Sequence, residues 1–123
     1  MHEHFGGHLS YFFSQKVGLP NEPRSATKIY RQEALAQAEN PIPGPLSGLP
    51  ISVKETFGMA DETITAGSKR MPPLRPEQDS EVVRRLRQAG AIIIARSNVP
   101  EFAMAGETEN PLYGRTNNPL DTS

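Results

Sequence analysis

The chain has 123 residues, enough for one domain with a modest core. Its 13 basic and 14 acidic residues give a net charge of −1, so no strong attraction to nucleic acid or to a membrane surface is expected. Cysteine is absent, which excludes disulfides and thiolate metal sites and fits a cytoplasmic location. The longest apolar run, from Ala91 to Ala95, is too short to cross a bilayer.

Residues 1–24 are expected to form a poorly structured N-terminal tail, because glycine and proline interrupt them repeatedly. Three histidines, His2, His4 and His8, lie close together in this segment. At a chain terminus, with no supporting partner residues evident, such a cluster is usually incidental. We therefore expect no metal site there.

A helix is predicted over residues 25–39, where apolar residues recur at helical spacing. Ser25 or Thr27 is the expected N-cap residue. The proline-rich segment 41–45 ends the helix, because proline cannot continue it.

The segment from Leu49 to Lys54 predicts a short strand, since it is rich in β-branched residues and follows a Gly-Leu-Pro turn. Alternation along the strand places Ser52 and Lys54 on one face and Ile51 and Val53 on the other. A buried lysine must be paired or neutral, and a neutral amine is a general base. The alternative is an edge strand whose lysine reaches solvent. The strand alone favours this alternative, because exposed lysines greatly outnumber buried ones.

The second half of the chain predicts a parallel crossover. Residues 57–78 form a long irregular connection, and a helix follows from Ser80 to Ala89, capped by Asp79 or Ser80 and ended by glycine. Its arginines are expected on a solvated face. The β-branched run Ala91 to Ala95 predicts a strand covered on both faces. The fold class is therefore α/β, with a sheet that two strands leave incomplete.

Several motifs occur in a fixed order and together resemble the amidase signature family. They are Gly44 to Glu55, Ala66-Gly67-Ser68, Asp79 to Gly90, Arg96 to Met104 and Gly106 to Ser123. The resemblance runs from about Ala34 to Ser123. It implies the N-terminal portion of a mixed-sheet α/β sandwich, with residues 25–123 as the N-terminal part of an amidase domain that stops before the family's Gly/Ser-rich catalytic loop.

The resemblance implies a Ser–cis-Ser–Lys amide hydrolase in which Lys54 is the catalytic base, acting from a buried strand with hydroxyl partners. It implies a small-molecule amide substrate and no metal or organic cofactor. None of the nine serines has the Gly-Gly-Ser-Ser-Gly-Gly context of the two catalytic serines. The chain alone is therefore expected to be inactive. Met104 is a candidate substrate contact, although a methionine after a phenylalanine is more often a core residue.

Two positions depart from the usual family pattern. Glu55 replaces a commoner aspartate, and Arg96 stands where lysine is common. We expect both changes to matter little, and strand alternation should point Glu55 away from Lys54.

Two alternatives remain open. In the first, the chain is a non-catalytic remnant, or a binding protein that needs a partner to cover its unfinished sheet edge. In the second, the chain belongs to the A subunit of a tRNA-dependent Asp/Glu amidotransferase.

Overall fold

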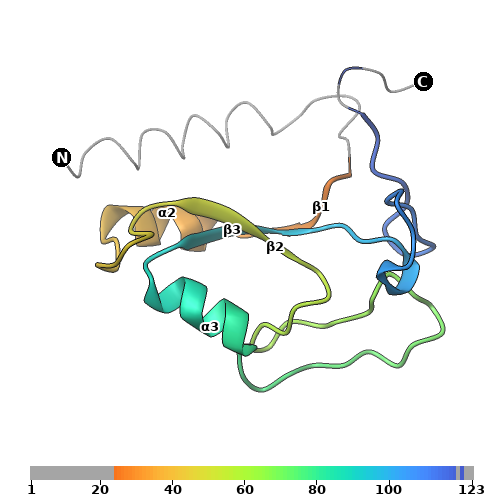
Figure 1. The fold of residues 1–123 in the computed structure, drawn as a ribbon, viewed down its shortest axis with the longest axis horizontal. Coiled ribbons are helices and arrows are strands. Elements are labelled where there is room, and N and C mark those ends of the chain that lie inside the picture. Colours follow the sequence, from red (N-terminus) through yellow and green to blue (C-terminus); the bar gives the residue numbers. More distant parts are fainter. Residues whose placement is uncertain (1–23, 119, 121–123) are drawn as a thin grey trace.

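The computed structural model describes residues 24–118 and residue 120, so the predicted tail and its histidines lie outside the described residues except for Arg24. The described part is a mixed α/β unit, as predicted (Figure 1). Its elements are β1 (Ala26–Ile29), α2 (Arg31–Glu39), β2 (Pro50–Lys54), α3 (Glu81–Gln88), β3 (Ile92–Ser97) and the 3₁₀ turn η1 (Glu101–Ala103).

The three strands form one sheet in the order β1-β3-β2. Strand β3 is central, with β2 parallel to it and β1 antiparallel to it. The predicted parallel crossover from β2 through α3 to β3 is confirmed. Residues 57–78, predicted as an irregular connection, contain no helix or strand, and only a single bridge joins Ile64 to Leu74.

The prediction of one helix over residues 25–39 is wrong in its first part. Residues 26–29 form β1, and α2 begins only at Arg31. The backbone of β1 pairs with the free edge of β3, and the amide of Tyr30 donates to the carbonyl of Ile94 at 2.9 Å. These sheet hydrogen bonds outweigh the weak helical preference of the segment, which contains two β-branched residues.

The predicted cap is wrong for α2 but correct in position for α3. The N-cap residue of α2 is Tyr30, and no side chain caps its backbone. Ser80 is the N-cap residue of α3, as predicted, although its side chain makes no cap bond. Asp79 serves other partners instead: its carboxylate accepts the amide of Ala60 at 2.8 Å and pairs with Arg87 at 2.9 Å.

Arg84 and Arg85 are exposed on the solvated face of α3, as predicted, whereas Arg87 is half-buried. Arg84 and Arg85 both bind Glu81, and these bonds lower the pKa of the Glu81 carboxyl to about 2. The apolar face of the helix is buried at Val83, which packs with Tyr30, Val53, Met59 and Ile93. The helix ends at Gln88 with Ala89 as its C-cap residue, and Gly90 follows with φ of +92°, in agreement with the predicted glycine stop.

The second core cluster lies where α2 meets the start of β3 and consists of Ala34, Ala38 and Ile92, with Leu35 and Ile94 against it. Strand β3 was predicted to be covered on both faces. This holds for Ile92 and Ile93, which are buried, but Ile94, Ala95 and Ser97 are only half-buried. The strand is thus covered at its beginning and partly open towards its end. Over the described residues, neither helix has the length and hydropathy needed to cross a membrane.

Candidate active site

Lys54 is the last residue of β2, at the C-terminal end of a parallel strand pair. Open α/β sheets bind their ligands at this end of the strands. Val53 is buried, whereas Ser52 and Lys54 are exposed, so the predicted alternation of faces is confirmed. In the parallel register Lys54 lies opposite Ser97 of β3, which places a hydroxyl residue beside the lysine on the same face.

The expectation of a buried Lys54 is wrong for the described chain. Strand β2 is at the edge of the sheet, and the lysine side chain is exposed, as the alternative reading of the strand required. The cause lies in what covers each face. Val53 packs in the cluster that contains Val83 of α3, while α2 packs near Ile92, at the other end of the sheet from Lys54.

Glu55 points away from Lys54, as predicted, and is fully buried. Its carboxylate accepts three hydrogen bonds: from the Thr65 amide at 2.7 Å, the Thr65 hydroxyl at 2.9 Å and the Ala66 amide at 3.1 Å. A buried carboxylate is tolerated when it is bonded in this way. Sequence reasoning missed this role, because the partners lie ten residues further along an irregular loop.

Arg96 is also buried, and it fixes two backbone segments. One of its Nη atoms donates to the carbonyl of Glu55, and the other donates to the carbonyl of Thr63 at 2.7 Å. The fork of a guanidinium group suits such a double contact better than a lysine amine does. Arg96 therefore holds the end of β2 against the following loop.

Two buried asparagines organise the segment after β3. The Asn110 amide nitrogen donates to the Asn98 side chain at 2.8 Å and to the carbonyl of Val99 at 2.7 Å. Its oxygen accepts the amides of Leu112 and Tyr113. The Asn98 amide nitrogen in turn binds Arg24, Gly114 and Thr116. Neither asparagine was predicted as a site residue, although both lie in motifs that carry the family resemblance.

The loops at this end have strained backbones. Ala66, Phe102 and Ala103 have φ values between 51° and 57°, which non-glycine residues rarely adopt. The amide of Phe102 donates to the carbonyl of Ala66 at 2.8 Å, so two strained segments support each other. Gly67 has φ of +67°, and a Cβ there would lie 2.9 Å from the Asn110 side chain. Such strain often clusters at functional sites. Figure 1 shows this region, where the green loop meets the blue one.

Met104 follows η1 and is 84% exposed. A methionine after a phenylalanine is ordinarily a core residue, but Met104 is not one in the described chain. Phe102 beside it is also exposed. Contact of Met104 with substrate stays a prediction.

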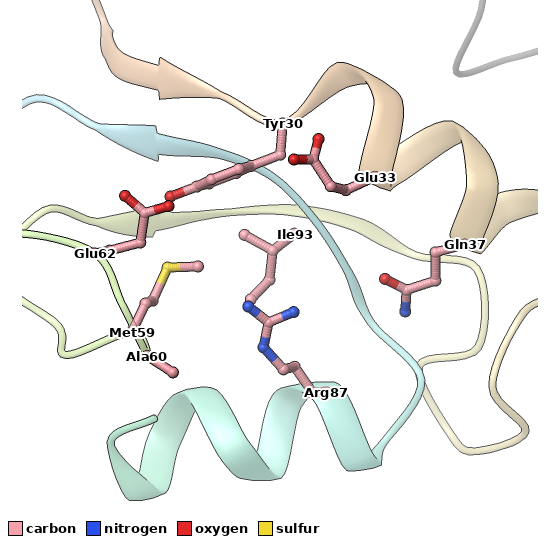
Figure 2. A pocket seen from close by; sticks show the side chains of 8 residues that line it. All are labelled: Tyr30, Glu33, Gln37, Met59, Ala60, Glu62, Arg87 and Ile93. Carbon is pink, nitrogen blue, oxygen red and sulfur yellow. The ribbon is translucent and has the colours of Figure 1, made fainter. Parts of the chain in front are cut away.

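A cavity of about 200 Å³ lies elsewhere, between α2, α3 and the segment from Met59 to Glu62 (Figure 2). Lys54 and Met104 do not line it, and none of its residues was predicted as a site residue. The lining residues are Tyr30, Glu33, Gln37, Met59, Ala60, Glu62, Arg87 and Ile93. Burial and the neighbouring Glu62 carboxylate raise the pKa of the Tyr30 hydroxyl. Among the described residues, no three acidic, histidine or cysteine side chains are grouped to hold a metal ion.

The fold and the loops around Lys54 match one protein family. Residues 18–123 match the family described as Amidase, so the chain belongs to the amidase family. The match begins before Ala34, where the recognisable motifs start, and takes in part of the segment predicted to be a tail.

The curated relatives include A subunits of glutamyl-tRNA(Gln) amidotransferases. The one from Syntrophobacter fumaroxidans is 43% identical over 120 residues, which is 92% of this chain and 25% of the relative. The one from Salinispora tropica is 45% identical over 80 residues, or 65% of this chain and 16% of the relative. The chain thus spans about a quarter or less of the length of these relatives.

Solved structures with the same fold include amide hydrolases. The peptide amidase from Stenotrophomonas maltophilia has a TM-score of 0.73 and 26% identity, over 95% of this chain and 27% of that one. A protein from a vestigial complex that reveals the evolutionary origins of an s-triazine catabolic enzyme has a TM-score of 0.80 and 31% identity. The match covers 96% of this chain and 28% of that one.

Proposed function

We propose that residues 25–123 are the N-terminal part of an amidase domain that converts a carboxylic amide to a carboxylate and ammonia or an amine. The observation that carries the proposal is the place of Lys54. It lies at the C-terminal end of a parallel strand, opposite Ser97, and its side chain is exposed in the described chain. The family match over residues 18–123 supports the same reaction class.

In this proposal Lys54 is the base of a Ser–cis-Ser–Lys relay, the arrangement that the family resemblance implies. The neutral amine takes a proton through the bridging serine as the nucleophilic serine oxygen bonds to the amide carbon. The proton then passes to the leaving nitrogen as the C–N bond breaks. Water cleaves the resulting acyl ester. Proton transfer and acyl transfer by side chains suffice, so the proposal includes no cofactor.

The two serines of the relay are proposed to lie outside residues 1–123, because none of the nine serines has the expected Gly/Ser-rich context. Residues 1–123 alone are therefore proposed to be inactive. The exposure of Lys54 agrees with this, since its side chain has no hydrogen-bond partner among the residues that the structure describes. The segment that carries the serines would cover Lys54 and exclude water from the amine.

A narrower proposal is that the complete protein is an amidotransferase A subunit working with partner subunits in the cytoplasm. The identities of 43% and 45% to curated A subunits favour it. A stand-alone amidase is favoured by the peptide amidase fold match. The two differ in whether amide cleavage needs a partner.

The test uses the complete polypeptide, meaning the product of the natural reading frame that contains residues 1–123. Its sequence should contain a Gly-Gly-Ser-Ser-Gly-Gly-like loop after Ser123. The purified product should release ammonia or an amine from simple carboxylic amides, alone or only with its partner subunits. A stop codon directly after Ser123 in sound DNA sequence, or no amide cleavage in either form, would contradict the proposal.

A further inference from the structure

We propose that Glu55 is a positioning residue for Lys54: its buried carboxylate holds the loop at the end of β2 so that the lysine backbone keeps one place. This inference rests on the proposed function of Lys54 and extends it to a residue that does not touch substrate.

The first step is the burial and bonding of the carboxylate. Glu55 is 0% exposed, yet no cationic side chain within the described residues pairs with it. Three donors from two consecutive residues, Thr65 and Ala66, satisfy its oxygens instead. Such charge-assisted bonds are short and directional, so the carboxylate fixes the loop to the strand.

The second step is that both sides of Lys54 are held. Lys54 pairs with Ser97 in the sheet, and the Glu55 amide donates to the Ser97 carbonyl at 3.1 Å. The Lys54 carbonyl accepts the amide of Phe57 at 2.9 Å. The guanidinium of Arg96 binds the Glu55 carbonyl from the other side. The main chain on either side of Lys54 is therefore held by hydrogen bonds to Ser97, Phe57 and Arg96.

The third step connects this arrangement to the rest of the site. The Thr65 hydroxyl, which is bound to Glu55, lies 3.0 Å from the Tyr113 hydroxyl. The Thr65 hydroxyl also accepts the amide of Gly67 at 3.2 Å. The carbonyl of Ala66 accepts the amide of Phe102. Through these contacts one carboxylate sets the loop after β2 against both loops after β3, and it supports the strained backbone at Ala66.

The chemistry explains why a small displacement matters. A relay of hydrogen-bonded groups reacts only when donor and acceptor are aligned, and a shift of about 1 Å lowers a rate by about 100-fold. Glu55→Gln keeps the size of the side chain but leaves one oxygen to accept three donors and adds an amide that faces those donors. Glu55→Asp keeps the charge and shortens the reach.

The experiment measures kcat and KM of amide hydrolysis in the complete polypeptide, with rates expressed per folded molecule well below the melting temperature. We expect Glu55→Gln to lower kcat about 10–100-fold with KM changed less than about threefold, and Glu55→Asp to recover part of the loss. A residue that acts only on stability would lower the melting temperature and leave kcat per folded molecule unchanged. The matched control is Glu77→Gln, an exposed carboxylate on the same long connection, with kcat unchanged.

Two further variants make every outcome decisive. Thr65→Val removes one of the three donors and should lower kcat by several-fold. It takes the place of Glu55→Gln in the test if Glu55→Gln does not fold. Unchanged kcat in Glu55→Gln, or in Thr65→Val where Glu55→Gln does not fold, overturns the positioning role. Lys54→Ala separates the two proposals, because an inactive Lys54→Ala beside a fully active Glu55→Gln rejects only the role of Glu55. A fully active Lys54→Ala rejects the proposed function itself.

Discussion

The two ends of the sheet are held together in different ways. At the N-terminal ends of β2 and β3, apolar side chains pack around Ile92, and backbones approach closely at Gly90. At the C-terminal ends, buried polar side chains bind backbone groups, with Glu55, Arg96 and Asn110 as the centres. Apolar packing tolerates exchanges that conserve volume, whereas a buried polar network specifies one arrangement of loops. The end with the polar network is the one that carries Lys54, the proposed base.

The largest effect is expected at the packed end, from Gly90→Ala. Gly90 has φ of +92°, and a Cβ there would meet the carbonyl of Ile42 and lie 2.8 Å from the Ser47 Cα. The left-handed conformation and the overpacking together should lower the free energy of unfolding by about 4 kcal/mol. Urea denaturation of the complete polypeptide measures it. Gly106→Ala is the control, since nothing lies within 4 Å of its Cβ position, and equal losses in both would show that close packing is not the cause.

The polar end is tested by Asn110→Ala. The substitution removes two donated and two accepted hydrogen bonds, and the two donated ones end on the buried residues Asn98 and Val99. We expect a loss of about 3 kcal/mol in the free energy of unfolding. Asn118→Ala, at an exposed position, should change it by less than about 0.5 kcal/mol. A neutral Asn110→Ala would mean that the polar network does not hold the loops.

A matched valine pair tests the face of the sheet opposite Lys54. Val83 is 0% exposed and Val82 beside it is 48% exposed. Val83→Ala should cost about 2 kcal/mol, because it removes two buried methyl groups and leaves a cavity. Val82→Ala should be close to neutral. Similar effects at both positions would contradict the packing of α3 on this face.

The smallest effect is a loss of stability at alkaline pH. Burial, and next the Glu62 carboxylate, raise the pKa of Tyr30, which is 8% exposed, above its value near 10 in an unfolded chain. The folded state therefore prefers the neutral phenol. Its contribution is complete below about pH 10 and is lost as the pH rises towards the folded value. Tyr30→Phe should reduce the decline in unfolding free energy between pH 9 and 11 by about 1 kcal/mol. If the unfolding free energy of Tyr30→Phe declined as steeply as that of the natural protein, another group would be responsible for the pH dependence.

The sequence predicted the packed end better than the polar end. The β-branched runs of β2 and β3 and the apolar face of α3 are local signals in the sequence, and the structure confirms these elements and their parallel crossover. Strand β1 was missed because only its pairing with β3 makes it a strand.

The polar contacts at the C-terminal end were not predicted, since they join residues distant in sequence. Glu55 meets Thr65 across an irregular loop, and Asn98 meets Asn110. Polar residues carry no periodic signal that reveals burial. The exposure of Lys54 was also not predicted by the family resemblance, because it depends on which segments cover that face.

The central claim is that this chain supplies the base of an amide hydrolase, and Lys54→Ala tests it most directly. In the complete polypeptide, the variant should lose at least about 10⁴-fold in kcat while its melting temperature and circular dichroism stay close to those of the natural protein. Lys69→Ala, an exposed lysine away from the strand, should keep full activity. A Lys54→Ala variant that hydrolyses amides at the natural rate would contradict the account.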